Sequence, residues 1–327
     1  MVLVLNKKDL LSLLTPSDSI SAVEDGYAKL ALRNVMMPQR TIMNIEDPLG
    51  FFGVMPVASK DIGGIAIKII STFPSNSLKV NLPPTMGFIA LHDVSTGQLL
   101  ALMDGVSLTA FRTSAASGVA TKYLSRANSE VVGIFGTGVQ ARAQLEAVCS
   151  VRPIKHIKTY GTQIAKAKEF SKDMSNILGV DITPCNDPKE TVTESDIVIT
   201  CSTSTTPVFD GRWLSVGTHI NGIGSHRPEA RELDSITIKR SKIVVDSVEA
   251  CLKEAGDIII PINEGAITQD HLYTELGEII LGNKAGRIND DEITLFKSVG
   301  VAVQDLAITM KAYNLAKERG VGNTIEL

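Results

Sequence analysis

The feature that most constrains this chain is a glycine-rich segment between a strand-like run and a helix-like run. Residues 131–135 read VVGIF, an apolar, β-branched run typical of a buried parallel strand. Gly136, Gly138 and Ala141 follow in a G-x-G-x-x-A pattern, and helical periodicity begins at Val139. In this context Gly136 permits a tight turn, and Gly138 lets a pyrophosphate approach the helix N-terminus. The segment predicts a dinucleotide site; the alternative is an ordinary strand-to-helix turn that binds nothing.

Composition favours a globular protein of more than one domain. The chain has 327 residues, of which 44% are hydrophobic. Its net charge of −4 and its lack of a long basic run argue against a nucleic-acid partner. It shows no signal-peptide layout and no stretch that could span a membrane, so we expect a cytoplasmic protein without a membrane partner. The four widely spaced cysteines indicate reduced thiols and no metal site, with a nucleophilic cysteine as the less favoured alternative.

Two regions of different pattern follow one another along the chain. Residues 7–34 look helical, with Thr15 or Ser17 as a possible cap. Strand-like runs broken by Gly, Pro and Asn follow, including the Pro74–Pro84 loop. These runs are Thr41–Ile45, Phe51–Val57, Ile65–Ser71, Thr85–His92 and Gln98–Asp104. Such a run of strands before any alternation predicts a separate domain.

The second region alternates strands with helices. A helix at 107–126, with Ser107 as its N-cap, leads into the glycine-rich segment. Residues 301–319 are helical again, and their stripe at Val303, Leu306, Met310 and Tyr313 is typical of core packing. Further strands are predicted at His156–Tyr160, Val180–Thr183, Ile197–Cys201, Thr218–Ile223 and Lys242–Asp246. Helices are predicted at Ile164–Leu178 and Val248–Ala255. This order predicts an α/β protein with a doubly wound parallel sheet of Rossmann type.

The interval after the glycines bears on the choice of cofactor. An acidic residue that bonds the ribose 2′-hydroxyl is expected about twenty residues further on, near Tyr160-Gly161-Thr162. No Asp or Glu lies between Glu146 and Glu169. The same interval carries the cations Arg152, Lys155, Lys158, Lys166 and Lys168. The missing carboxylate, with Thr162 as a donor and Lys166 nearby, favours NADP over NAD; alternatively, these lysines form a solvated helix face.

Three cations in the first region are candidates for binding an anion. Lys68 lies inside an apolar strand, where an unpaired ammonium would be costly. Arg40 and Arg112 could each bind a carboxylate through a planar guanidinium. From composition alone, internal ion pairs are the favoured alternative, with partners Glu46, Asp47 or Asp104.

A histidine follows one of the predicted strands of the second region. The strand ends at Gly222-Ile223-Gly224, and His226 comes directly after it. Doubly wound sheets bind ligands beyond the carboxyl ends of their strands, and a histidine there could act as an acid or a base. A loop histidine that is merely exposed is the alternative.

Taken together, these segments resemble the ornithine cyclodeaminase/μ-crystallin family over nearly the whole chain. The matching segments are PQRT (38–41), GVMP (53–56), the Lys68 strand, LTAFRTSAASGVATKYLSR (108–126), GIFGTGVQARAQLEA (133–147), STSTTPVF (202–209), INGIGSHRPEARELD (220–234), ELGEIILGNKAGR (275–287) and LFKSVGVAVQDLA (295–307). The resemblance implies a nicotinamide cofactor bound by a Rossmann domain at 114–302. It also implies an α+β substrate-binding and dimerisation domain at 1–113 with 303–327, and hence a homodimer.

The resemblance also assigns roles to residues. Arg40, Lys68 and Arg112 match the residues that hold the substrate carboxylate, which reverses the preference for internal ion pairs. Ser298 and Val299 lie near nicotinamide and substrate, with Val299 on the substrate side. The residues expected around the cofactor are Arg112, Thr113, Gly136, Gly138, Val139, Gln140, Gly161, Thr162, Lys166, Thr203, Ile220, Asn221, Gly222, Ile223 and Ser298.

Two departures from the family pattern bear on the reaction. His226 stands where ornithine cyclodeaminases carry an aspartate, and Gly53 stands where they carry a glutamate. We therefore predict an NAD(P)-dependent oxidoreductase that acts on the Cα–N bond of a small amino or imino acid. It would resemble an alanine dehydrogenase or a ketimine or cyclic-imine reductase, with Lys68 or His226 moving the proton. The alternatives are an ornithine cyclodeaminase and a non-enzymatic, μ-crystallin-like binding protein.

Overall fold

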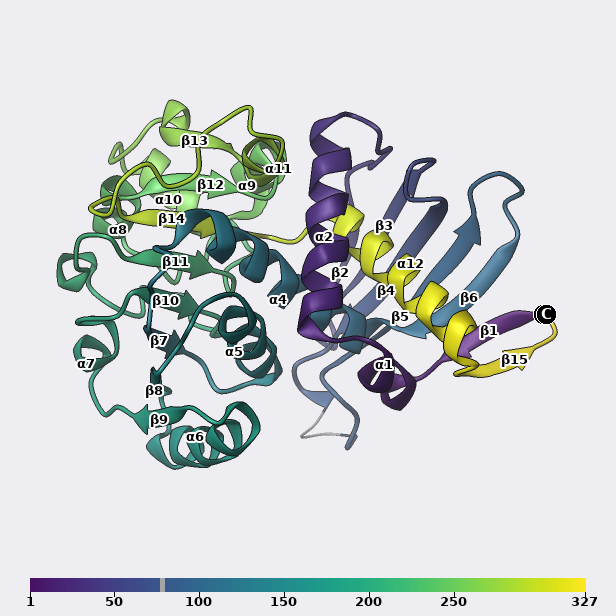
Figure 1. The fold of residues 1–327 in the computed structure, drawn as a ribbon, viewed down its shortest axis with the longest axis horizontal. Helices are drawn as coiled ribbons and strands as arrows, with labels where there is room; N and C mark the ends of the chain where they lie inside the picture. The colour runs from purple at the N-terminus through teal and green to yellow at the C-terminus, as the bar shows by residue number, and fades with distance from the viewer. Residues whose placement is uncertain (77–79) are drawn as a thin grey trace. The chain divides into compact units, whose positions relative to one another are not determined.

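The computed structural model describes residues 1–76 and 80–327, so residues 77–79 of the Pro74–Pro84 loop lie outside the described part. The chain divides into two compact units (Figure 1). Unit 1 comprises Met1–Arg112 with Ala302–Leu327, and unit 2 comprises Thr113–Val301. No helix among the described residues combines the length and the hydropathy of a membrane span.

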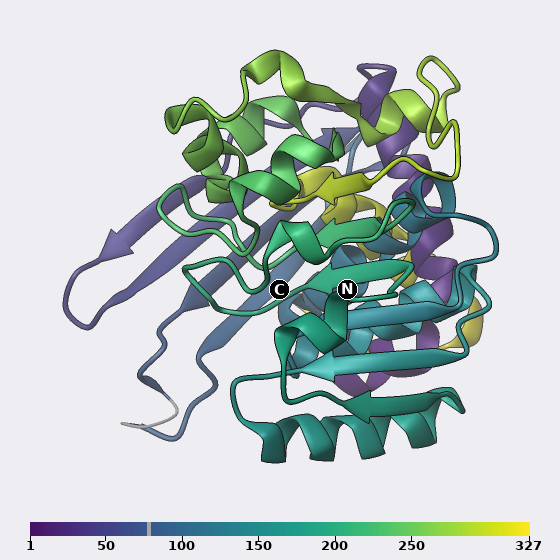
Figure 2. The same ribbon diagram turned by 90° about the vertical axis from the view of Figure 1, so that its left-hand side faces the viewer.

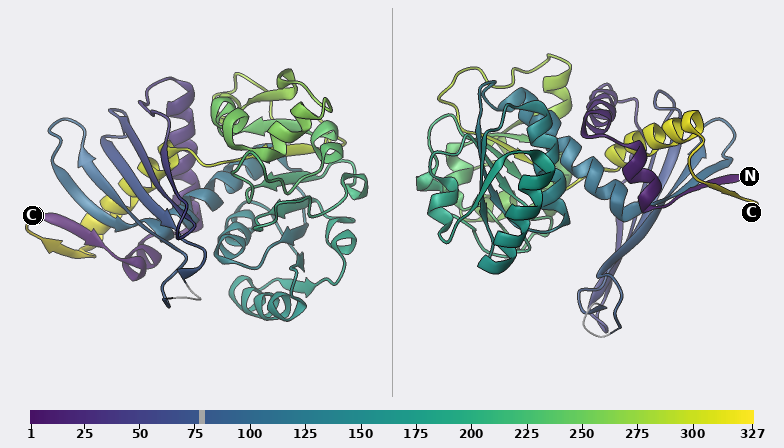
Figure 3. Two further views of the ribbon diagram at one scale, coloured as in Figure 1. Left: turned by 180° about the vertical axis from the view of Figure 1, so that it is seen from behind. Right: turned by 60° about the horizontal axis from the view of Figure 1, so that its bottom comes forward.

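Unit 1 is built on a seven-stranded sheet of order β15-β1-β6-β5-β4-β3-β2. Only β1 and β6 pair in parallel, and the other neighbours are antiparallel. The strands are β1 (Val2–Leu5), β2 (Thr41–Ile45), β3 (Gly50–Ser59), β4 (Gly64–Thr72), β5 (Thr85–Asp93), β6 (Leu99–Asp104) and β15 (Asn323–Ile325). Because β15 pairs with β1, the two termini lie side by side (Figure 3, right).

Helices cover one face of this sheet. The expected helical stretch at 7–34 is two helices, α1 (Lys7–Leu13) and α2 (Pro16–Ala31), because Thr15 caps a new helix that has Pro16 at its first position. Thr15, not Ser17, is the cap. The C-terminal helix α12 (Ala302–Arg319) lies beside α2 over the sheet (Figure 1). Its stripe packs in the core as expected, with Val303 and Leu306 fully buried.

The opposite face of the sheet carries no helix among the described residues of unit 1 (Figure 3, left). On that face, one residue from each of five neighbouring strands is paired with the next in register, and all five residues of this row are apolar. The row is Val4, Leu102, Ala90, Ile67 and Pro56. All five residues are half-buried, although side chains in the facing layer are fully buried. An apolar surface of this kind is typical of an interface.

Unit 2 is an eight-stranded parallel sheet of order β13-β12-β14-β11-β10-β7-β8-β9 (Figure 2). Its strands are β7 (Val131–Phe135), β8 (His156–Tyr160), β9 (Asp181–Pro184), β10 (Ile197–Thr200), β11 (His219–Gly222), β12 (Lys242–Val245), β13 (Leu272–Glu275) and β14 (Thr294–Lys297). The helices are α4 (Gly105–Leu124, which begins in unit 1), α5 (Val139–Val151), α6 (Ile164–Leu178), α7 (Pro188–Val192), α8 (Ser235–Arg240), α9 (Val248–Glu254), α10 (Gly256–Asn263) and α11 (Leu276–Ile280). The predicted fold class is confirmed.

The parallel sheet has a core on each face. Along β10, Ile197 and Ile199 belong to one buried cluster and Val198 belongs to the other. Successive side chains of a strand point to opposite faces, so a strand covered on both faces reads as a continuous apolar run. The sequence analysis missed β13 and β14.

The start of α4 differs from the prediction. The helix begins at Gly105, and the Asp104 carboxylate accepts a hydrogen bond of 2.8 Å from the Ser107 backbone N–H. Ser107 is therefore not the N-cap, because an acidic side chain three residues earlier already occupies that role.

Two glycines of the dinucleotide segment should respond differently to alanine. At Gly133 an added Cβ would lie 2.1 Å from the Thr191 carbonyl oxygen, so Gly133→Ala should lower the free energy of unfolding by about 3 kcal/mol. At Gly138 no atom lies within 4 Å, and φ is −89°. Gly138→Ala should change stability by less than about 1 kcal/mol. Urea unfolding measures both, and equal midpoints would contradict the packing argument.

Candidate functional site

Lys68 is a single charge in an apolar row beneath α12. Its neighbours across the sheet, Leu5, Met103, Ile89 and Met55, are all buried. The Lys68 residue itself is 1% exposed. A buried ammonium in such surroundings requires an anionic partner.

That partner is Asp305 in the first turn of α12. The Lys68 Nζ donates to both carboxylate oxygens, at 3.0 Å to Oδ1 and 2.8 Å to Oδ2. The Arg112 Nε lies 3.3 Å from Oδ1 without good hydrogen-bond alignment, so that contact is mainly electrostatic. Next to Asp305, the Gln304 side chain accepts a 2.9 Å hydrogen bond from Arg112 and donates one to the Tyr27 hydroxyl. Two consecutive residues of α12 thus hold both cations.

The ion-pair partners suggested from composition are wrong. Asp104 caps α4, and Asp305 supplies the carboxylate for Lys68. Glu46 and Asp47 lie next to the cations in sequence, at the end of β2, but they form none of the ion pairs seen among the described residues. Lys68 and Asp305 are 237 residues apart, so local sequence could not reveal the pair.

The charges of Arg112 and Arg40 both act on Lys68. Burial, together with repulsion from Arg112 and Arg40, lowers the pKa of Lys68 to about 8, although the attraction of Asp305 opposes the shift. Lys68 and Arg112 share the single carboxylate of Asp305, which leaves these two cations with a net charge of 2 − 1 = +1. This cluster attracts an anion, and a guanidinium geometry suits a carboxylate.

The dinucleotide segment of unit 2 fits a pyrophosphate. Gly136 has φ +122°, and a Cβ there would lie 2.9 Å from the Cys201 carbonyl oxygen, so only glycine suits this turn. Gly138 caps α5 without a side-chain hydrogen bond, which leaves the first N–H groups of the helix available to an anion. Val139 is 67% exposed at the same helix end.

Three polar side-chain atoms of unit 2 are buried and available to a ligand. The Thr113 Oγ1, the Gln140 Oε1 and the Asn221 Oδ1 are buried without a hydrogen-bond partner among the described residues. Asn221 uses its amide nitrogen to donate to Thr121 Oγ1 at 3.0 Å. Since buried polar groups are normally satisfied, these residues fit a nicotinamide dinucleotide.

Buried carboxylates fix the loops at the carboxyl ends of the strands. After β14, the Asp246 Oδ2 accepts from Ser298 Oγ at 2.7 Å, from the Val299 N–H at 2.9 Å and from the Gly300 N–H at 2.7 Å. After β10 and β11, Glu232 accepts from the Ser202 N–H at 2.6 Å and the Gly224 N–H at 2.7 Å. The sequence analysis missed Asp246, Glu232 and Asp305. Asp246 and Asp305 are distinguished in the sequence only as acidic residues beside apolar ones, and Glu232 lies among other charged residues.

The remaining candidates lie on the surface or along β11. His226 is exposed, and its Nδ1 lies 3.2 Å from the Gly224 carbonyl oxygen. Thr203 and Thr162 are also exposed, and Gly161 is half-buried after β8. Ile220, Asn221, Gly222 and Ile223 are buried.

Three of the five cations that follow the glycine-rich segment have structural contacts. Arg152 donates to the carbonyls at the C-terminus of α4, at 2.8 Å to Thr121 and 2.7 Å to Lys122. Lys155 pairs with Glu130 at 2.5 Å, and Lys158 donates to the Thr193 carbonyl at 2.6 Å. Lys166 and Lys168 are exposed on the first turns of α6. Lys166 and Lys168 therefore remain as phosphate candidates, and Lys166 is the nearer of the two to Thr162 in the sequence.

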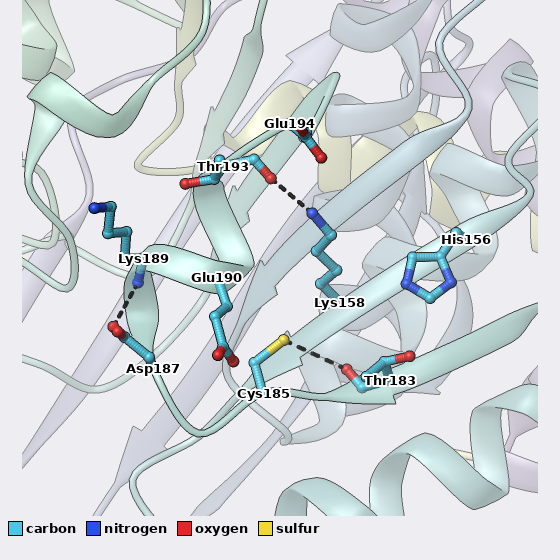
Figure 4. Close-up of a pocket in the computed structure, with 9 residues that line it drawn as sticks. All are labelled: His156, Lys158, Thr183, Cys185, Asp187, Lys189, Glu190, Thr193 and Glu194. Atoms are coloured by element: carbon cyan, nitrogen blue, oxygen red, sulfur yellow. Dashed lines mark hydrogen bonds between the residues drawn. The ribbon is translucent and has the colours of Figure 1, made fainter.

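A separate open groove of about 440 Å³ lies along β8, β9 and α7 (Figure 4). Its lining mixes Lys158 and Lys189 with Asp187, Glu190 and Glu194, so it presents no dominant charge. None of the predicted site residues lines this groove.

The chain is similar to known proteins along nearly its whole length. The model of the ornithine cyclodeaminase/mu-crystallin family matches residues 2–320. A Δ1-pyrroline-2-carboxylate reductase of Bacillus cereus is 42% identical over 92% of this chain and 94% of its own length. The structure of Thermococcus litoralis Δ1-pyrroline-2-carboxylate reductase with NADH and L-proline has TM-score 0.96 and 45% identity, covering 99% of this chain and all of that one. An archaeal alanine dehydrogenase dimer with bound NAD has TM-score 0.93 and 34% identity, covering 99% of each chain.

Removal of the Asp246 carboxylate should lower the free energy of unfolding, because the hydrogen bonds that it accepts are buried. Asp246→Ala takes one acceptor from two backbone N–H groups and one hydroxyl, and should lower the free energy of unfolding by about 2–4 kcal/mol. Asp93→Ala is the control, because Asp93 accepts the same kinds of bonds in an exposed turn where water can replace it. Its cost should be much smaller than that of Asp246→Ala. If urea unfolding shows the same loss of free energy in Asp246→Ala and Asp93→Ala, burial does not explain the contribution of Asp246.

Proposed function

Because this chain belongs to the ornithine cyclodeaminase/μ-crystallin family, we propose that it reduces Δ1-pyrroline-2-carboxylate to L-proline. In reaction type the chain is an NAD(P)-dependent oxidoreductase acting on the Cα–N bond of a small amino or imino acid, as predicted from the sequence. The finer assignment, to a cyclic imino acid, rests on the named substrate of the similar reductases and on this chain's own residues.

The observation that carries the proposal is the cluster of three cations around one carboxylate. Arg40, Lys68 and Arg112 bind the carboxylate of the imino acid, and Asp305 neutralises only one of the two positive charges of Lys68 and Arg112. Fixing the carboxylate fixes the position of the neighbouring C=N bond, and such positioning supplies much of the rate enhancement. A nicotinamide cofactor supplies the hydride when bound. Lys68 or His226 delivers the proton to the imine nitrogen.

The residue environment at Gly53 favours a cyclic imine over a diamine. A Cβ at Gly53 would meet the Ile42 Cδ1 at 3.0 Å and the Ile70 Cγ2 at 3.4 Å, so the surroundings are apolar. Cyclodeamination of ornithine requires an anionic anchor for the side-chain amine, and neither Gly53 nor His226 provides one. An apolar ring needs no such anchor.

The residues that would hold the cofactor are identified by polar groups that have no hydrogen-bond partner among the described residues. The N-terminus of α5 with Gly138, Val139 and Gln140 binds the pyrophosphate, and Thr113, Asn221 and Ser298 line the remainder of the site. Val299, held by Asp246, lies on the substrate side.

The central prediction is reduction of the cyclic imine without cyclodeamination. The wild-type protein should oxidise NAD(P)H with Δ1-pyrroline-2-carboxylate. It should form little or no proline from ornithine with catalytic NAD, because neither Gly53 nor His226 supplies an anionic anchor for the side-chain amine. Nicotinamide absorbance and product analysis measure the two reactions, and pyruvate with ammonia tests the alanine dehydrogenase alternative. Efficient proline formation from ornithine would overturn the assignment.

A variant of the cation cluster ties this activity to the site. Arg112→Ala should lower kcat/KM by about tenfold or more, since one charge-assisted bond to the carboxylate is worth roughly 1.5–3 kcal/mol. If Arg112→Ala has the kcat/KM of the wild type, Arg112 does not bind the substrate carboxylate and its role is structural.

The second prediction concerns the cofactor. NADPH should be used at least as well as NADH, because no acidic residue lies between Ala147 and Lys168 and Lys166 lies close to Thr162. Lys166→Ala should lower kcat/KM for NADPH more than kcat/KM for NADH. Lys168→Ala, on the same helix, should leave the ratio of these two kcat/KM values unchanged. A tenfold preference of the wild type for NADH, about 1.4 kcal/mol, would contradict this prediction.

The third prediction is a homodimer formed through the uncovered sheet face of unit 1. The half-buried row that contains Ile67 is apolar across five strands, and a second copy of the chain would bury it. The archaeal alanine dehydrogenase that this chain resembles is described as a dimer. Light scattering should give about twice the chain mass of 35.0 kDa.

One substitution on this face and one on the helical side of unit 1 test the interface. Ile67→Asp should shift the protein to monomers, because a charge would be buried in the interface. Leu11→Asp, on α1, is the control and should leave the dimer intact, since Leu11 is 58% exposed on the helical side. A stable wild-type monomer at micromolar concentration would defeat the proposal.

A further inference from the structure

The protein contains two buried Lys–Asp pairs that have different surroundings. Lys297 lies 2.8 Å from Asp257 in unit 2, and Lys68 lies 2.8 Å from Asp305 in unit 1. All four side chains are at most 2% exposed. Burial of a pair alone therefore does not distinguish a structural lysine from a functional one.

The hydrogen bonds of the two ammonium groups differ. Lys297 donates to the Ser225 carbonyl at 2.7 Å and to the Gly222 carbonyl at 3.2 Å, and its Nζ also lies 2.8 Å from the Asp257 Oδ2, so three different residues surround its ammonium group. Lys68 donates only to the two oxygens of Asp305 among the described residues. One N–H donor of Lys68 is left for a ligand.

The charges around the two lysines differ as well. Burial lowers the pKa of Lys297, but the Asp257 and Glu232 carboxylates outweigh it and hold that pKa above its ordinary value. Burial and the repulsion of two arginines together lower the pKa of Lys68 to about 8. Asp305 is the one carboxylate that opposes this fall.

We propose that Asp305 is the positioning residue of the substrate site: it holds Lys68 as an ammonium ion with one N–H free, and it orients Arg112 beside it. The inference rests on the proposed function, because it assigns the free donors to the substrate carboxylate. Asp305 does not touch the substrate and acts through Lys68 and Arg112.

The geometry explains why a carboxylate is needed at this position. Lys68 lies on β4, and its flanking partners Met55 on β3 and Ile89 on β5 are uncharged. The charged groups that face it are Asp305 from α12, Arg112 from α4 and Arg40 from the segment before β2. Without Asp305, three cations would share an apolar site, and Lys68 would release its proton most readily.

The sign of the pH effect follows from this arrangement. The ammonium form of Lys68 is present below its pKa and is lost as the pH rises through that pKa. Asp305→Asn removes the attraction that raises the pKa, so the ammonium form should be lost at lower pH. The alkaline limb of kcat/KM should move down by about one pH unit or more.

The experiment compares pH profiles of kcat/KM for the wild type, Asp305→Asn and Asp257→Asn with Δ1-pyrroline-2-carboxylate and NADPH. Both variants lose a carboxylate from a buried lysine, so both should unfold at lower temperature, but only Asp305→Asn should shift the alkaline limb. The ionisation of the substrate is common to all three proteins and cancels. An Asp305→Asn profile that superimposes on that of the wild type, or an equal shift in Asp257→Asn, would overturn the proposal.

A second variant keeps the test decisive if Asp305→Asn does not fold. Asp305→Glu retains the charge but displaces it by one methylene, so the limb should stay in place while KM rises at least threefold with kcat less affected. Wild-type KM in Asp305→Glu would count against the positioning role.

Two further measurements distinguish a failure of this proposal from a failure of the substrate assignment. If the wild type turns over pyruvate with ammonia in place of the cyclic imine, the proposed function fails, and the same profiles are measured with that substrate. Calorimetric binding of L-proline to the NADH-loaded wild type and variants gives the same readout without turnover: affinity should fall at lower pH in Asp305→Asn than in the wild type.

Discussion

The ion pair between Lys68 and Asp305 connects parts of unit 1 that are far apart in the chain. It joins the middle of β4 to the first turn of α12, and through Arg112 it also engages α4. A buried ion pair is weak evidence for stability, because apolar residues of similar volume often serve as well or better. The pair is therefore best explained by what an ammonium ion can do at this position. The helix that closes the chain returns to the sheet and brings with it the carboxylate that the strand lysine needs.

Unit 2 uses buried carboxylates for a different purpose. Asp246, Glu232 and Asp257 accept hydrogen bonds from backbone N–H groups of the loops beyond β10, β11 and β14. Those loops lie where a doubly wound sheet binds its ligand, and they have little regular secondary structure to hold them. Carboxylates with several N–H donors fix such loops in one conformation before a cofactor arrives, which reduces the ordering that binding requires.

Sequence analysis was most successful where the signal is local. The strand, turn and helix around Gly136 were predicted because periodicity and glycine positions are properties of neighbouring residues. Thr15 was one of two caps proposed for the same reason, with Ser17 as the other, whereas Ser107 was wrong because Asp104 already caps that helix. The need of Lys68 for an anion was predicted, but its partner was sought among residues close in the sequence. The cations after the glycines show the same limit, since Arg152 is held by carbonyls of α4 some thirty residues earlier.

The sequence by itself determined the two patterns of secondary structure, the dinucleotide turn, the cations available to an anion and the family to which the chain belongs. Hydrophobic periodicity and turn chemistry act between residues a few positions apart, so they can be read from the order of residues. Only the tertiary structure decided which carboxylate meets Lys68, which lysines and arginines are structural, and which buried polar atoms still lack a partner. Those outcomes depend on distance and burial in space, since an ammonium and a carboxylate interact strongly only when folding removes water and brings them within about 3 Å.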